Sequence, residues 1–231
     1  MTERVLPLVV RIERGAPPER TDALEAAATA VLRMLDPLSD PPADGDDGTG
    51  RSEEWAAAVA EWEDHRIRKV VRRARGAEWR RVLALPGITV TLRTAQVRVH
   101  PPVPLDDWPK DLSRLQVSGT ELSDSAPAPE PGVDVPVLWV NPRLDMTAGK
   151  AMAQAGHAVQ LAWWRTGERE RAVWRERGLA AAVRTADPDR WAALLDSGLP
   201  VVRDAGFTEI EPGSATVVAD APWLSQGVFE V

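Results

Sequence analysis

The strongest constraint on the fold of this 231-residue chain is that one pattern of segments occurs twice. A stretch rich in Ser, Pro, Ala and Glu, residues 119–134, reads as a linker between the two copies. In each copy a short apolar run precedes an Ala-rich helical stretch, a β-like run, a Trp-containing helical stretch and two final strands. The order of elements is therefore β-α-β-α-β-β, twice.

Strands that alternate with helices predict an α/β fold, in which each unit is a small mixed sheet packed between helices. We expect two tandem units that form a pseudo-dimer. The expected domains are residues 1–118, a linker at 119–134, and residues 135–231, and the first unit carries an acidic, Pro-rich loop at 36–50. The alternative is a chance similarity between two unrelated α/β halves. The matched segments are 20–35 with 148–164, 68–72 with 180–184, and 88–90 with 199–201.

Several classes of site are excluded by composition. The chain has no cysteine, so it can form neither a disulfide nor a thiolate nucleophile. Its three histidines, His65, His100 and His157, are widely spaced and do not form a zinc-ligand pattern. We expect no metal and no cofactor. The apolar run at 5–12 is too short and too closely flanked by charges for a membrane span or signal peptide, which predicts a cytoplasmic protein without membrane contact.

Charge is unevenly distributed along the chain. The net charge of −7 argues weakly against a nucleic-acid partner, because phosphate binding depends on clustered Lys and Arg. One dense basic stretch, 66–81, nevertheless stands out. It is either a solvated face or a contact for an RNA backbone. The tryptophans leave a similar choice between core packing and stacking on bases.

In the second unit, the helical stretch 148–164 carries a polar face. Lys150, Gln154 and His157 stand at positions i, i+4 and i+7, and Thr147 is placed to cap the helix. Only three of the 28 basic residues are lysine, which suggests that position 150 requires a compact ammonium group. Gly156 lowers helix stability and indicates a close approach by backbone or by a ligand. Taken alone, His157 has a simpler interpretation: a partly buried histidine whose hydrogen bonds are satisfied within the protein and which has no role in catalysis.

A second informative segment follows a predicted strand that ends near residue 203. Asp204 and Thr208 are four residues apart, and a turn at Gly206 would bring both side chains to one pocket. Pro212 and Gly213 then form a turn into a final strand that begins at Ser214.

Together these two segments resemble the class II, archaeal- and eukaryotic-type peptidyl-tRNA hydrolases over about residues 137–222. The resemblance is carried by Met146, Gly149, Lys150, Ala153, Gln154, His157 and Ala158, and by Asp204, Ala205, Gly206, Thr208, Ile210, Pro212, Gly213 and Ser214. It implies an α/β hydrolase that cleaves the ester between a peptide and the terminal ribose of tRNA, without a metal or cofactor.

The resemblance also implies roles for individual residues. Lys150, Asp204, Thr208 and His157 are the expected catalytic residues. The expected substrate-binding residues are Gln154, Gly206, Arg184, Ser214 and, from the first unit, Lys69. The expected partner is peptidyl-tRNA, bound by a monomer that is an internal pseudo-dimer, or by a homodimer.

Some positions depart from the family pattern and leave a second interpretation open. Ala148, Ala180 and Phe207 stand where the family has basic residues. The alternative is therefore a non-catalytic tRNA- or protein-binding regulatory protein with the same fold. The first unit looks chemically inert, because it has Arg20 at the place we match to Lys150 and Arg93 at the place of Asp204.

Overall fold

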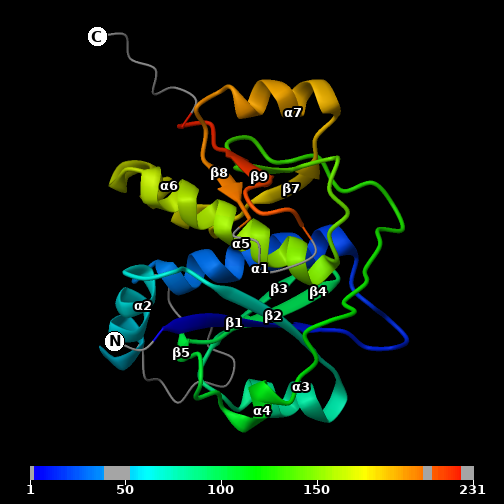
Figure 1. The fold of residues 1–231 in the computed structure, drawn as a ribbon, viewed down its shortest axis with the longest axis vertical. Coiled ribbons are helices and arrows are strands. Elements are labelled where there is room, and N and C mark those ends of the chain that lie inside the picture. Colours follow the sequence, from blue (N-terminus) through cyan, green and yellow to red (C-terminus); the bar gives the residue numbers. More distant parts are fainter. Residues whose placement is uncertain (1–2, 39–52, 205–209, 225–231) are drawn as a thin grey trace.

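The structure is a computed structural model that describes residues 3–38, 53–204 and 210–224. The chain folds into two layered α/β units, each built on its own mixed sheet. In Figure 1 the N-terminal unit lies at the bottom and the C-terminal unit at the top. The expected α/β class with two tandem units is confirmed.

The elements of the first unit are β1 (Arg4–Arg11), α1 (Arg20–Leu35), α2 (Glu53–Glu63), β2 (Lys69–Ala74), α3 (Gly76–Leu83), β3 (Ile88–Leu92), β4 (Ala95–Val99), β5 (Val103–Pro104) and α4 (Lys110–Ser113). The strand order is β2-β1-β4-β3, and β5 pairs with β1 outside this path. β1 is parallel to β2 and antiparallel to β4. The described part of the segment 119–134 that follows contains no helix or strand.

The elements of the second unit are β6 (Val137–Val140), α5 (Ala148–Arg165), α6 (Glu168–Glu176), β7 (Ala182–Thr185), α7 (Pro188–Leu195), β8 (Val201–Arg203) and β9 (Ala215–Asp220). The strand order is β7-β6-β9-β8, with β6 parallel to β7 and antiparallel to β9. This topology repeats that of the first sheet. Each unit also has a helix that the repeat pattern lacks, α2 in the first and α6 in the second.

The two long helices α1 and α5 lie between the two sheets (Figure 1). α1 packs on β3 and β4 of its own sheet, α5 packs on β8 and β9, and the two helices pack against each other. The outer face of the first sheet is covered by α3 and α4, and the outer face of the second by α7. α5 also packs on β2 of the first sheet and α1 on β7 of the second, so the two helices lie side by side in one central layer between the sheets.

Small side chains allow this central helix pair to pack closely. The buried alanines of the pair are Ala23, Ala26, Ala27, Ala28 and Ala30 on α1, and Ala151, Ala155, Ala158 and Ala162 on α5. A single hydrophobic cluster contains these residues together with apolar residues of both sheets. The two units therefore share one core rather than touching at a polar interface.

Gly156 lies at the tightest point of the helix pair. A Cβ atom at this position would lie 3.0 Å from Val31 Cγ2 on α1 and 3.1 Å from Lys69 Cδ on β2. Val31 is fully buried and cannot move away easily. The close approach expected at this glycine is therefore made by the other unit. Gly149, in the first turn of the same helix, has more room, since a Cβ there would meet Thr120 Cβ at 3.5 Å.

We predict that the substitutions Gly156→Ala and Gly149→Ala have opposite effects on stability. Alanine is favoured over glycine in a helix by about 1 kcal/mol, so Gly149→Ala should be neutral or stabilising. Gly156→Ala should instead lower the free energy of unfolding by about 1–3 kcal/mol, because it overpacks the helix pair. Urea unfolding of the two variants measures both effects. A stabilising Gly156→Ala would show that the two units are not packed closely at this point.

His100 is buried where the chain leaves β4. Its ring Nδ1 lies 2.7 Å from the carbonyl oxygen of Pro86, and its backbone N–H donates to Pro7. Because a carbonyl can only accept, Nδ1 carries a proton, and it is burial that keeps the ring neutral. Burial lowers the pKa of His100 to about 4.

This histidine predicts a loss of stability in acid. The unfolded chain binds the proton below its ordinary pKa of about 6.5, whereas the folded chain binds it only near the lowered value. The contribution of His100 to the free energy of unfolding is therefore fully present above that ordinary pKa. It falls by about 3 kcal/mol as the pH is lowered to 4. Urea unfolding across this range should show a shallower pH dependence for His100→Gln than for the wild type. Equal slopes would contradict the assignment.

Candidate functional site

The candidate site is built around an ion pair between the first turn of α5 and the residue that follows β8. Lys150 Nζ lies 3.4 Å from Asp204 Oδ2, and each side chain is only 9% exposed. Thr147 caps α5 by accepting a hydrogen bond from Lys150 N, as its position in the sequence predicts. The structure therefore brings together two of the four residues expected to be catalytic.

A β-bulge helps to aim Asp204. The register between β8 and β9 shifts between Val202 and Arg203, directly before the aspartate. Bulges of this kind bend a strand and redirect the side chains that follow. Asp204 N donates to the carbonyl of Ser214, and Gly213 N donates to the carbonyl of Asp204, so the backbone is held on both sides of the turn. Ser214 thus contacts the site through its backbone.

Gln154 joins the same cluster from the next turn of α5. Its Nε2 donates to Asp204 Oδ1 at 3.3 Å, and its Oε1 accepts from Thr216 Oγ1 at 2.7 Å. Thr216 is fully buried on β9. The Asp204 carboxylate can only accept, so it selects the NH₂ end of the Gln154 amide and leaves Oε1 to accept from Thr216. Gln154 and Lys150 thus hold the two oxygens of Asp204 from one helix.

Thr208 and Gly206, which the sequence assigns to the same site, lie outside the described residues. The same holds for most of the loop at 36–50. The roles of Thr208 and Gly206 stay predictions.

His157 lies one turn beyond Gln154 on α5, and its nearest described polar partner comes from the other unit. Lys69 Nζ, at the start of β2, is 3.2 Å from His157 Nδ1 and 2.5 Å from Gln160 Oε1. Burial, and then the positive charge of Lys69, hold the pKa of His157 well below its usual value. Lys69 itself is 8% exposed, so it lies between the units and not on an open binding surface.

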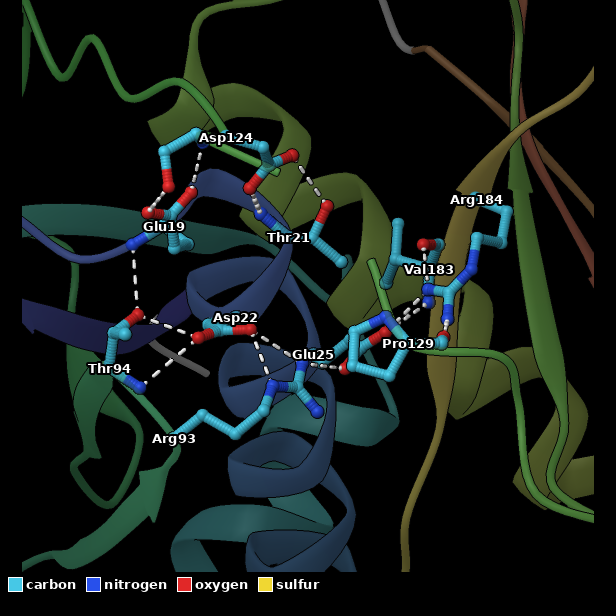
Figure 2. Close-up of polar contacts among 11 residues, drawn as sticks. Glu19, Thr21, Asp22, Glu25, Arg93, Thr94, Asp124, Pro129, Val183 and Arg184 are labelled. Atoms are coloured by element: carbon cyan, nitrogen blue, oxygen red, sulfur yellow. Dashed lines mark hydrogen bonds and ion pairs between the residues drawn. The ribbon is translucent and has the colours of Figure 1, made fainter. Parts of the chain in front are cut away.

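Arg184, expected to bind substrate, is instead engaged by an acidic residue of α1 (Figure 2). Glu25 Oε1 accepts from Arg184 Nη1 at 2.8 Å and from Val183 N at 3.0 Å, while its other oxygen accepts from Arg93. Arg184 also donates to the carbonyl of Pro129 in the linker segment. This cluster joins both units and the segment between them.

The first unit has an ion pair of reversed polarity at the place equivalent to the candidate site. Arg93 directly follows β3 as Asp204 follows β8, and Asp22 is the third residue of α1 as Lys150 is the third of α5. Arg93 lies 2.6 Å from Asp22 (Figure 2). The match of Lys150 with Arg20 is therefore wrong by two residues, because the sequence comparison did not fix where each helix begins. Arg20 instead donates to the carbonyl of Met146 beside the start of α5.

The basic stretch 66–81 is largely occupied by contacts within the unit. Arg68 pairs with Glu3, and Arg81 pairs with Asp111. Arg72 donates to the carbonyl of Leu115 and lies over the ring of Trp108, and Arg73 donates to the carbonyl of Gly119. Much of this charge holds α4 and the segment after it against β2, which neither of the two sequence interpretations foresaw.

Sequence reasoning missed two residues that organise these clusters. Thr216 lies in a strand that was foreseen, but no pattern distinguishes a threonine that orients an amide from one that only fills a strand. Glu25 lies in an Ala-rich helix whose partner in the other unit is not apparent from spacing. In the described ranges there is no group of three or more acidic or histidine side chains arranged to hold a metal ion.

The described helices also include none that is both long and apolar enough to cross a membrane.

Comparison with known proteins identifies relatives of the second unit. The family model described as Peptidyl-tRNA hydrolase PTH2 matches residues 135–231. A protein named Peptidyl-tRNA hydrolase from Haloquadratum walsbyi is 37% identical over 95 residues, which cover 38% of this chain and 85% of the relative. Another of the same name from Methanocaldococcus jannaschii is 35% identical over 107 residues, covering 41% and 91%.

A mouse relative, named Peptidyl-tRNA hydrolase 2, mitochondrial, is 36% identical over 131 residues, covering 52% of this chain and 71% of the relative. No solved structure matches the chain. The matches cover most of each relative, and the family match coincides with the unit that holds Lys150, Gln154 and Asp204. The chain belongs to the PTH2 family of peptidyl-tRNA hydrolases.

Proposed function

We propose that this protein hydrolyses the ester bond of peptidyl-tRNA and releases free tRNA and peptide. Three polar side chains of the second unit, Lys150, Gln154 and Asp204, meet within hydrogen-bonding or ion-pairing distance. They belong to the part of the chain that matches the family. This convergence is the observation that carries the proposal. The relatives named for the same activity support the choice of substrate.

The chemistry requires a positioned water and a stabilised oxyanion. Asp204 accepts a proton from the attacking water as its oxygen bonds to the ester carbon. The Lys150 ammonium stabilises the negative charge that develops on the carbonyl oxygen, in a site where both side chains are nearly shielded from solvent. When the carbon–oxygen bond breaks, the ribose oxygen takes up the proton held by Asp204, and the peptide leaves as a carboxylic acid that loses its remaining proton to solvent.

Gln154 and Thr216 keep the base in place. The Thr216 hydroxyl donates to Oε1 of Gln154, and Nε2 of the same amide donates to one oxygen of Asp204. For Thr208 we propose the catalytic role, and for Gly206 and Ser214 the substrate-binding role, that the family resemblance implies. Holding the carboxylate on two sides restricts its rotation, which favours attack by a water in one orientation.

Only the second unit carries this chemistry in our proposal. The equivalent ion pair of the first unit, Asp22 with Arg93, has the opposite polarity and is bound into the contact with Glu25 and Arg184. We propose that residues 1–118 support the catalytic unit at 135–231 as a covalent partner, with 119–134 as the linker, and that the protein acts as a monomer. Because the substrate arises on ribosomes, we propose action in the cytoplasm.

We expect Lys150→Ala and Asp204→Asn each to lower the rate of ester cleavage by about a hundredfold or more, since each removes a group used in the transition state. The assay is incubation with a peptidyl-tRNA whose amino group is blocked, scored for free tRNA. Matched controls are Lys110→Ala and Asp106→Asn, which change an exposed lysine and an exposed aspartate of the first unit. Full activity of either site variant would overturn the role given to that residue, and no cleavage by the wild type would overturn the substrate.

A further inference from the structure

A buried lysine of the first unit reaches across the core to the helix that carries the candidate site. Lys69 begins β2, and its Nζ contacts two residues of α5, His157 and Gln160. Its alkyl chain packs directly against Gly156, where a Cβ would come within 3.1 Å of Cδ and 3.4 Å of Cε. The second unit thus makes room for this side chain by having no side chain of its own at position 156.

The surroundings of the Lys69 nitrogen match an ammonium ion. An ammonium has three N–H donors and no acceptor. The three polar atoms near it are Gln160 Oε1 at 2.5 Å, His157 Nδ1 at 3.2 Å and the carbonyl oxygen of Ile67 at 3.5 Å. The nitrogen also lies 4.7 Å from the centre of the Trp62 ring, a contact that favours a cation.

A carboxylate fixes the orientation of Gln160. Glu63 Oε1 accepts from Gln160 Nε2 at 3.4 Å and from Trp164 Nε1 at 2.8 Å. A carboxylate accepts and cannot donate, so it selects the NH₂ end of the amide and leaves Oε1 facing Lys69. Burial lowers the pKa of Lys69 well below its usual value, and the negative charge of Glu63 opposes that effect.

The alternative is a neutral amine. A neutral lysine has two donors and one lone pair, so it could serve Gln160 and Ile67 and then accept from a protonated His157 Nδ1. The two arrangements place the histidine proton on different ring nitrogens. The tautomer of His157 therefore reports whether Lys69 donates to Nδ1 or accepts from it.

We propose that Lys69 of the first unit positions His157 of the second: its ammonium donates to Nδ1, which fixes the imidazole as a neutral ring that carries its proton on Nε2. Through Nε2 the ring then donates a hydrogen bond and does not accept a proton. His157 accordingly acts as a donor to an oxygen atom of the tRNA acceptor end, such as a phosphate or ester oxygen, and is not a general base. This last step rests on the function proposed above.

The direct test is the tautomer of His157 in the full-length wild-type protein. The chain has only three histidines, so long-range proton–nitrogen NMR spectra resolve three rings, and His157→Gln identifies the one of interest. At neutral pH we expect an unprotonated Nδ1 and a protonated Nε2 for His157. A protonated Nδ1 would overturn the proposal. This measurement requires neither a Lys69 variant nor activity.

A variant tests the cause. Lys69→Met keeps the length of the side chain and removes its charge and its donors. Because the Lys69 charge lowers the pKa of His157, the titration midpoint of His157 should rise in this variant, and the preference for the Nε2–H tautomer should be lost. Lys110→Met removes an exposed lysine and should leave His157 unchanged. An identical His157 titration in Lys69→Met and wild type would contradict the positioning role.

Kinetics separate positioning from a general loss of structure. If Lys69 acts through His157, Lys69→Met and His157→Gln should lower kcat/KM in the same direction, and the double variant should be no slower than His157→Gln alone. If the loss of kcat/KM in the double variant equalled the product of the two single-variant losses, Lys69 would act independently of His157, and the proposal would be overturned. If the wild type does not cleave peptidyl-tRNA but shows the expected tautomer, the proposed function fails while the positioning of His157 stands.

Discussion

The contact between α1 and α5 is the constraint on which the rest of this structure depends. Each helix packs on its own sheet, on the helix of the other unit and on one strand of the other unit's sheet. A helix with two apolar sides cannot be left exposed to water on either one. Neither sheet therefore has a complete core until both units are present, which explains why Ala and Gly dominate the surfaces that meet.

The same contact allows the two units to differ chemically. Two polar clusters link the units across the helix pair. In one, Glu25 contacts Arg93 and Arg184. In the other, Lys69 contacts His157, Gln160 and Trp62. Buried charges are costly unless they are paired, so each cluster is set by partners from both units. A symmetric homodimer would need two identical copies of each cluster. A single chain with two unlike halves can give the first unit a structural role and leave the chemistry to the second.

Much of the fold could be predicted from the sequence. The apolar periodicity of 20–35 and 148–164 gave both central helices nearly to the residue, because an Ala-rich amphipathic pattern is strong over four turns. The helices α2 and α6, which the repeat pattern lacked, occupy the same place in the two units, between the central helix and the second strand. The register of the repeat was two residues wrong at α1, since a helix start that lacks a side-chain cap gives little sequence signal.

The candidate site was predictable where one helix carries its residues. Spacing alone places Lys150 and Gln154 on the same face, and the resemblance supplied Asp204. What spacing could not supply are partners that arrive from other elements: Thr216 on β9, Glu25 on α1, and the contact of Lys69 with α5. Such contacts depend on how two sheets are stacked, which no local pattern encodes.

The most direct test of this account is the behaviour of residues 135–231 produced without the first unit. Removing α1 exposes the side of α5 at Gly156, which packs against Val31 of α1. We expect the isolated segment either to self-associate, as seen by analytical ultracentrifugation, or to unfold at a much lower urea concentration than the full chain. A segment that is monomeric, folded and as stable as the intact protein would contradict the claim that the two units share one core.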